Sequence, residues 1–320
     1  MTMPRLALPL LLAVASASLS GASLAAEPVR LVVAFTPGGP VDTVARSLSE
    51  PLGKVLGRTV IVENRPGANG NIAASYVAKA PADGNTLFLT SVGAVAISPA
   101  LYTNLPYDPA NDFAPVSRVV NNATVFVVGA SNPATDATDF VARAQAAGQP
   151  PAIGSSGVGS IPHLALEMFR DSTQAPLMHV PYKGASQVVA DVIGGHAAGF
   201  FGDLPGVIGQ IQAGTLKPLG LASAQQQAAL PGVRTLAEQG IAGVESNNWY
   251  ALLAPAGTSA ETVAALNKAV RESLADPAVK SRLEAFGAEV APSSPEELAA
   301  LIEADRRKWT DLITRKNIQP

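Results

Sequence analysis

Short apolar runs alternate with amphipathic segments along most of the chain. The runs are nearly continuous in Val, Ile, Leu and Phe, as is typical of strands that are buried on both faces. The segments predicted as strands are Val29–Phe35, Thr59–Asn64, Thr86–Ser91, Thr124–Val128, Ala152–Ser155, Leu177–Pro181, Ala197–Phe201, Leu216–Ala222 and Asn248–Ala254.

Helical patterns lie between these strands. The segments predicted as helices are Val41–Leu56, Asn71–Ala78, Asp136–Ala147, Pro162–Arg170, Ser186–Ile193 and Leu204–Ala213. Strands that alternate with helices favour parallel sheets with right-handed crossovers. The pattern therefore predicts an α/β fold.

The C-terminal part is mostly helical. Ser259–Leu274 has an apolar face, and Asp276 caps a second helix that ends near Gly287. A third helix starts with Ser294 as N-cap, Pro295 at N1 and Glu297 at N3, which predicts a capping box. Its apolar stripe is predicted to pack against the body of the protein and consists of Leu298, Leu301, Ile302, Trp309, Leu312 and Ile313.

Two segments indicate that the chain crosses between two lobes. Asn121–Asn122 precedes a new strand–helix series, and the polar segment 225–244 contains the turn signals Pro231-Gly232 and Gly240. We therefore expect residues 27–122 and 245–320 to form lobe 1 and 123–224 to form lobe 2. A chain that crosses twice leaves a cleft between its lobes, and such clefts are favoured sites for small molecules.

The N-terminal residues 1–26 read as a cleavable export signal. Arg5 is followed by an apolar run and by Ser23-Leu24-Ala25, so cleavage is expected near Ala25–Ala26. This predicts an exported protein with no direct membrane insertion after leader removal. The chain has no cysteine and a net charge of −3, which leaves no thiol chemistry and no electrostatic attraction to nucleic acid.

Three glycine-containing turns each join a predicted strand to a predicted helix. Unpaired N–H groups at a helix start form an anion site that needs no charged side chain. The first turn contains Gly38 and Gly39, with Asp42 close behind as a residue that ties down its own loop. The candidate residues of the second turn are Ser155, Ser156, Gly157, Gly159 and Ser160. Those of the third turn are Tyr182, Lys183, Gly184, Ala185 and Ser186.

Other candidate ligand contacts lie at strand ends. Asp203 could bind a ligand amine or a bridging water, and Ser91 could donate a hydrogen bond. The three histidines, His163, His179 and His196, lack the spacing of a metal site, so no metal and no cofactor is expected. A secreted serine hydrolase that uses Ser156 and His163 remains an alternative, although Ser156 lacks the nucleophile-elbow sequence.

The sequence resembles the Bug family, the periplasmic receptors of tripartite tricarboxylate transporters. The resemblance covers essentially the whole chain after the leader. It is carried by AFTPGGPVDTVAR at 34–46, VIVENRPGANGNIAA at 60–74, KAPADGNTLFLTS at 79–91, GSSGVGS followed by His163, VPYKGASQVVADVIGGH at 180–196 and NNWYALLAPAGT at 247–258.

The resemblance implies a two-lobe type II periplasmic binding protein fold with a ligand cleft. It further implies a non-enzymatic receptor that captures a small organic acid and delivers it to the membrane subunits of such a transporter. The ligand carboxylate would be held by N–H groups and waters at Phe35–Asp42 and Ser155–Ser160, with help from Tyr182–Ser186. Thr36 departs from the proline of many relatives and adds a hydroxyl, while Phe35 and His163 complete the candidates. A sensor for a signalling partner is the other alternative.

Overall fold

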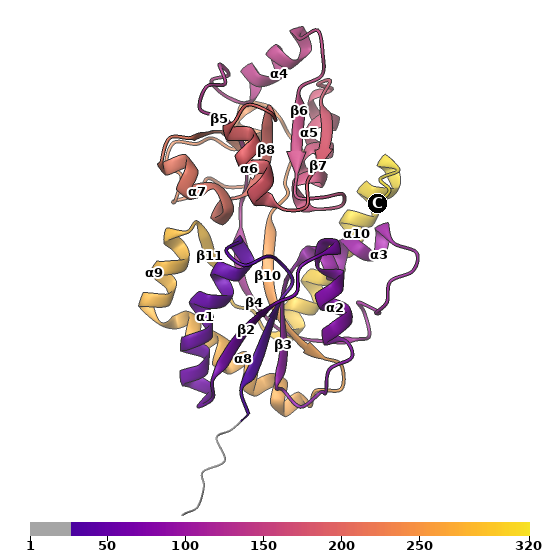
Figure 1. Cartoon of the computed structure of the whole chain (residues 1–320), viewed down its shortest axis with the longest axis vertical. Coiled ribbons are helices and arrows are strands. Elements are labelled where there is room, and N and C mark those ends of the chain that lie inside the picture. Colours follow the sequence, from indigo (N-terminus) through magenta and orange to yellow (C-terminus); the bar gives the residue numbers. More distant parts are fainter. Residues whose placement is uncertain (1–26) are drawn as a thin grey trace, which may run out of the picture.

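The computed structural model describes residues 27–320, which form two mixed β-sheets, each with its own helices (Figure 1). The first sheet has the strand order β11-β4-β10-β3-β1-β2, and the second has the order β7-β6-β8-β5-β9. We call each sheet with its helices a lobe. The predicted export signal lies outside the described residues.

The first lobe contains both ends of the described chain. Its strands are β1 (Val29–Val33), β2 (Val60–Asn64), β3 (Thr86–Ser91), β4 (Phe113–Asn122), β10 (Asn248–Pro255) and β11 (Ala288–Val290). Its helices are α1 (Pro40–Leu56), the short η1 (Ala68–Gly70), α2 (Asn71–Val77), the π-helix η2 (Gly93–Ile97), α3 (Ser98–Leu101), α8 (Ala260–Ala275), α9 (Pro277–Ala285) and α10 (Pro295–Lys316).

The second lobe is built from the middle of the chain. Its strands are β5 (Thr124–Gly129), β6 (Ala152–Ser155), β7 (Met178–Pro181), β8 (Gly199–Asp203) and β9 (Leu216–Leu221). Its helices are α4 (Ala137–Ala146), α5 (Ile161–Thr173), α6 (Ala185–Ile193) and α7 (Leu204–Gln212), and the 3₁₀ turn η3 (Ala237–Gln239) follows β9.

The chain leaves the first sheet after β4 and returns to it with β10 (Figure 1). The predicted α/β class with two lobes is confirmed. The exact domain boundaries, residues 27–122 plus 245–320 and 123–224, stay a prediction. Within residues 27–320, none of the helices combines the length and hydropathy needed to cross a lipid bilayer.

The expectation of parallel sheets is correct for only part of each sheet. β1 pairs in parallel with β2 and β3, but β10 is antiparallel to both of its neighbours, and β5 is antiparallel to β8 and β9. The long β4 was also missed, because Pro115 and several polar residues interrupt its apolar pattern. Pro115 is tolerated because it pairs with Leu253 beside a register shift, where the ladder is already irregular.

Each sheet is covered on both faces by apolar clusters. The capping box predicted for α10 is present, and the helix packs its stripe into a cluster that also contains Phe88, Trp249 and Leu253. Leu298, Trp309, Leu312 and Ile313 are buried, and Leu301 and Ile302 pack against them. The predicted packing role of this stripe is therefore confirmed.

Truncating Trp309 tests how much the stripe of α10 stabilises the fold. Trp309 is 1% exposed, so we expect W309A to lower the free energy of unfolding by about 3–5 kcal/mol, mostly from the lost burial and the cavity left behind. Urea unfolding monitored by far-UV circular dichroism measures this change. T310A, at the exposed neighbouring position, is the control and should shift stability by at most about 0.5 kcal/mol. Equal effects of the two variants would contradict the packing role.

Candidate ligand-binding site

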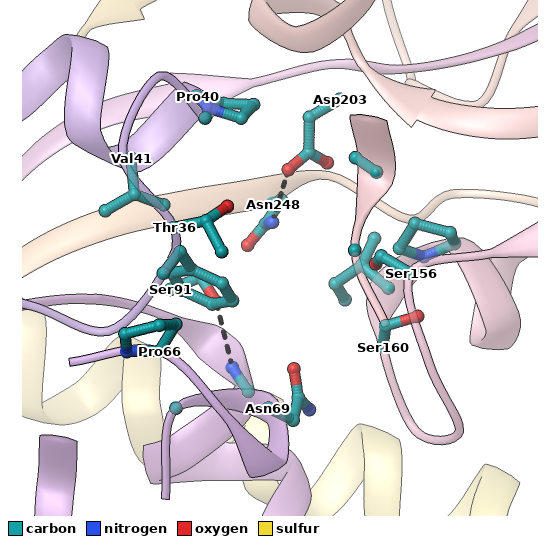
Figure 2. A pocket seen from close by; sticks show the side chains of 18 of the residues that line it. Thr36, Pro40, Val41, Pro66, Asn69, Ser91, Ser156, Ser160, Asp203 and Asn248 are labelled. Atoms are coloured by element: carbon teal, nitrogen blue, oxygen red, sulfur yellow. Dashed lines mark hydrogen bonds between the residues drawn. The ribbon is translucent and has the colours of Figure 1, made fainter. Parts of the chain in front are cut away.

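A cavity of about 140 Å³ lies between the two lobes and is lined by residues of both. In Figure 2, Thr36, Val41 and Ser91 of the first lobe face Ser156 and Ser160 of the second lobe across this space. Asp203 and Asn248 close one end, and Asn69 lies at the opposite end of the view. Residues that are far apart in the sequence are thus brought to one small hollow.

Five α-helices begin at this cavity. It is lined by the N-cap residues of α1, α2, α5, α6 and α7, which are Gly39, Gly70, Ser160, Gly184 and Asp203. None of these helices has a hydrogen bond from its N-cap side chain to its first turn. The first N–H groups of a helix have no partner inside the helix, so these N-termini direct partial positive charge towards the cavity.

Four of the five α-helices of the described chain that start elsewhere are capped by a side chain. Asp136, Ser259, Asp276 and Ser294 each accept a hydrogen bond from the first turn of α4, α8, α9 and α10. None of these four residues lines the cavity. The remaining α-helix, α3, also lacks a side-chain cap, but its N-cap residue, Ile97, does not line the cavity. The contrast indicates that the cavity is built to leave helix N-termini open.

The turn before α1 is fixed by a buried carboxylate. Asp42 is 2% exposed, and its Oδ2 accepts hydrogen bonds from Gly38 N (2.9 Å) and Arg46 Nε (2.8 Å), while Oδ1 accepts from Asn64 Nδ2 (2.9 Å). Burial disfavours the charged form, but these hydrogen bonds outweigh it and hold the pKa of Asp42 below its usual value. Asp42 shapes the loop and does not line the cavity.

The turn before α5 rests on two stacked histidines. The rings of His163 and His179 are 3.7 Å apart and almost parallel. His163 Nδ1 accepts a hydrogen bond from Gly159 N (3.1 Å), and His179 Nε2 lies 2.6 Å from Ser155 Oγ. Burial lowers the pKa of each histidine to about 4, so both are neutral at pH 7 and His163 can act as an acceptor.

Asp203 joins the two lobes. Its Oδ2 accepts hydrogen bonds from Asn248 Nδ2 (2.8 Å) and the Tyr250 hydroxyl (2.9 Å), both on β10. Burial raises the pKa of Asp203 to about 6 despite these two hydrogen bonds. The same burial, together with the nearby carboxylate, raises the pKa of Tyr250 well above its usual value, so the phenol remains a donor.

The charged side chains that line the cavity are Lys183 and Asp203. Among residues 27–320, no group of three or more His, Asp or Glu side chains is placed to hold a metal ion. The cavity wall is otherwise made of backbone, hydroxyl, amide and apolar groups. Such a wall can hold a small ion mainly through oriented dipoles.

The structure places the predicted site residues in two groups. Those that line the cavity are Phe35, Thr36, Gly39, Ser91, Ser156, Ser160, Lys183, Gly184, Ala185, Ser186 and Asp203. Those that lie outside its lining are Gly38, Asp42, Ser155, Gly157, Gly159, His163 and Tyr182. The second group mostly supports the turns from behind.

The supporting contacts explain why these residues are not exposed to the cavity. Gly157 N donates to Ser155 Oγ (3.2 Å), and the carbonyl of Gly157 accepts from Ser160 Oγ (2.7 Å). The Tyr182 hydroxyl donates to Asp191 Oδ2 (2.7 Å), which turns it away towards α6. Loop geometry, which the sequence does not specify, decides between lining and support.

The geometry does not assemble the hydrolase pair Ser156–His163. Ser156 lines the cavity, whereas His163 is buried behind the turn and its Nδ1 is occupied by Gly159 N. Ser155, which does approach a histidine, is fully buried and has no surface open to a substrate. A serine nucleophile needs both a general base and access to the reacting carbonyl.

Several cavity residues were not predicted. They include the segment Pro66–Gly70, the start of η2 at Val92 and Gly93, and Asn248 and Tyr250 on β10. Pro66–Gly70 is another glycine-containing turn between a strand and a helix, so the signal used for the other turns could have found it. Ala68 and Asn69 there have positive φ angles of 47° and 52°, and Asn69 Nδ2 donates to Gly159 O of the other lobe (3.2 Å). Asn248 gave a weaker signal as a polar residue at the start of an apolar strand.

The fold is similar to that of several solved structures. The structure of R. palustris Rpa4515 with adipate has a TM-score of 0.87 and 34% identity, covering 92% of this chain and 98% of that one. Periplasmic binding protein BugD has a TM-score of 0.85 and 31% identity, covering 91% of this chain and 98% of that one. MatC from Rhodopseudomonas palustris with bound malate has a TM-score of 0.83 and 29% identity, covering 89% of this chain and 98% of that one.

A family comparison agrees with the structural one. Residues 44–318 match the family described as the tripartite tricarboxylate transporter family receptor, TctC. The match includes all of the second lobe and nearly all of the first, and it is a family of substrate-binding proteins, not of enzymes. The chain therefore belongs to the TctC/Bug family of periplasmic solute-binding receptors.

Proposed function

We propose that this receptor captures a small carboxylate between its lobes and delivers it to the membrane subunits of a tripartite tricarboxylate-type transporter. The main support is the convergence of five uncapped helix N-termini on one cavity. Partial positive charges and N–H donors at helix starts stabilise a carboxylate without requiring a salt bridge. The adipate and malate bound to the two Rhodopseudomonas relatives support the same ligand class.

The mode of binding also suits release. A carboxylate held by neutral N–H groups and bridging waters forms no buried ion pair that must be broken when the ligand leaves. Lys183, which is exposed at the cavity wall, adds attraction without enclosing the charge. Since each lobe supplies some of the contacts, the ligand favours the closed arrangement of the lobes, and the closed form is the one that docks on the transporter.

A screen of small mono-, di- and tricarboxylates by thermal shift tests the proposed ligand class. A ligand at 100 times its dissociation constant stabilises the native state by about 2.7 kcal/mol, which raises the melting temperature by several degrees. We expect at least one acid to do so, with binding then measured by calorimetry. A folded protein that no carboxylate stabilises would overturn the proposal.

Removing one amide donor tests the role of the helix starts. Ala185 is the first residue of α6 after Gly184, whose backbone is extended, so proline fits there and deletes only the N–H group. We expect A185P to weaken acid binding by roughly 10- to 100-fold, the value of a hydrogen bond to a charged group.

The matched control for A185P is A260P. Ala260 has the same position at the start of α8, which lies far from the cavity and is capped through Thr262 N. Its binding should equal that of the wild type. Equal affinity of A185P and A260P, with both folds intact by circular dichroism, would show that the α6 amide does not hold the ligand.

Acid should loosen the turn before α5. The folded-state pKa of His163 and His179 is about 4, below the ordinary value of about 6.5, so the unfolded chain binds more protons between these values. Stability is therefore fully present above about pH 6.5 and falls as the pH drops towards 4. Urea unfolding at a series of pH values measures the slope, which H163Q and H179Q should each reduce.

The control for this pH effect is H196Q, because His196 is exposed and contacts neither the turn nor the cavity. It should retain the wild-type slope. Of the neighbouring charges, Glu167 raises and Arg170 lowers the pKa of His179. A slope that remains unchanged in both H163Q and H179Q would contradict the account of two neutral buried histidines.

A further inference from the structure

One carboxylate oxygen at the end of the cavity has no partner. Asp203 Oδ2 accepts from Asn248 and Tyr250, but Asp203 Oδ1 is a buried atom without a hydrogen bond in the described chain. The same holds for Asn248 Oδ1. The orientation of the Asn248 amide is fixed, because its Nδ2 must face the carboxylate. Two buried acceptors are thus left without a hydrogen-bond partner, on residues that are 45 positions apart in the sequence.

Both residues line the cavity, and Figure 2 shows them together at its end, joined by the hydrogen bond between their side chains. Asp203 is the N-cap of α7, where an aspartate normally accepts from its own helix. Here the Asp203 side chain accepts no hydrogen bond from α7 and instead accepts one from Asn248 on β10 of the other lobe. The sequence position alone would favour a cap, so the observed orientation points to another role.

An unpaired acceptor away from water costs about 1–3 kcal/mol, and an unpaired charge costs more. A second carboxylate of a ligand would repel Asp203 and donate nothing. A hydroxyl supplies one proton and leaves the charge uncompensated. An ammonium group supplies several N–H donors together with the opposite charge, so it can both donate hydrogen bonds and compensate the carboxylate.

Other groups of the cavity wall have the reverse character. The starts of α5 and α6 and the Lys183 side chain provide N–H donors and positive charge. A ligand that carries both an anionic and a cationic group would find a matching partner for each. We propose that Asp203 and Asn248 form a subsite for a ligand ammonium group, so that the cavity takes a small amino acid as its zwitterion. This inference rests on the proposed function.

Matched sets of acids test the subsite. Each set has one carbon skeleton with hydrogen, hydroxyl or ammonium at the same carbon: propionate, lactate and alanine; succinate, malate and aspartate; glutarate, 2-hydroxyglutarate and glutamate; 3-phenylpropionate, phenyllactate and phenylalanine. Calorimetry should show that, in the set that fits, the amino acid binds at least about 10-fold more tightly than its two analogues. In D203N this preference should disappear.

Two controls separate the subsite from general effects. K183Q should weaken all members of a set alike and leave their ratio unchanged, because Lys183 belongs to the carboxylate side. D203N should unfold at the same temperature as the wild type or a higher one at pH 7.5, because its amide oxygen can still accept from Asn248 and Tyr250. A loss of preference in D203N is then not a loss of fold.

The pH dependence gives an independent readout. Burial raises the pKa of Asp203 to about 6, so protons compete with the ammonium group at low pH. Lys183 and Tyr250 are the other titratable groups on the cavity wall, and burial and the nearby carboxylate raise the pKa of Tyr250 well above its usual value, so its phenol does not titrate in this range. The amino acid should therefore bind several-fold more weakly at pH 5 than at pH 7.5, while its unsubstituted analogue should not.

The outcomes are distinguishable. If an unsubstituted or hydroxy acid binds as tightly as its amino acid, or if D203N keeps the preference, the ammonium subsite is wrong while the carboxylate receptor stands. If no acid of any set binds and the broader carboxylate screen also fails, both proposals are wrong. A preference for the amino acid that depends on Asp203 supports both.

Discussion

The structure depends on helix dipoles that are left open at one place. Five helices from two separate lobes start at the same cavity, and none of them is closed by its own N-cap side chain. Open N-termini are normally unfavourable, because buried N–H groups need partners. Because these N-termini surround a cavity, an anion or water that enters it can accept hydrogen bonds from their N–H groups. The stabilisation that a side-chain cap would have given each helix can therefore come from a bound ligand.

The open helix starts require a rigid support, and buried polar groups provide it. Asp42 fixes the turn before α1 through three hydrogen bonds, and the stacked His163 and His179 fix the turn before α5. These groups lie just behind the cavity wall. Both groups must be in the correct protonation state to act as acceptors. Asp42 must be ionised to accept its three hydrogen bonds, and His163 must be neutral to accept the hydrogen bond from Gly159 N. Both conditions hold at neutral pH.

Polar and apolar contacts both join the lobes near the cavity. Asp203 reaches Asn248 and Tyr250, and Asn69 reaches the carbonyl of Gly159. Contacts of this kind can be exchanged for contacts with water at little cost, because each net hydrogen bond contributes only about 0.5–1.5 kcal/mol. Apolar contacts are also present, because Ile161 and Leu164 of α5 are buried in the same cluster as Ile97 and Leu101 of the first lobe. The polar contacts suit a receptor that must both enclose a ligand and give it up.

The sequence by itself determined the α/β class, nearly all strands and helices, and the three turns that lead to helix starts at the cavity, because apolar periodicity and glycine–serine turns are local signals. It did not reveal β4, whose Pro115 is tolerated only beside a register shift with β10, nor the antiparallel entry of β10 and β5. Nor could it separate Gly39, which lines the cavity, from Gly38, whose N–H group is taken by Asp42. Only the tertiary structure decided that Asn248 and Tyr250 meet Asp203, since those contacts join residues 45 and 47 positions apart in different lobes and leave no local pattern in the chain.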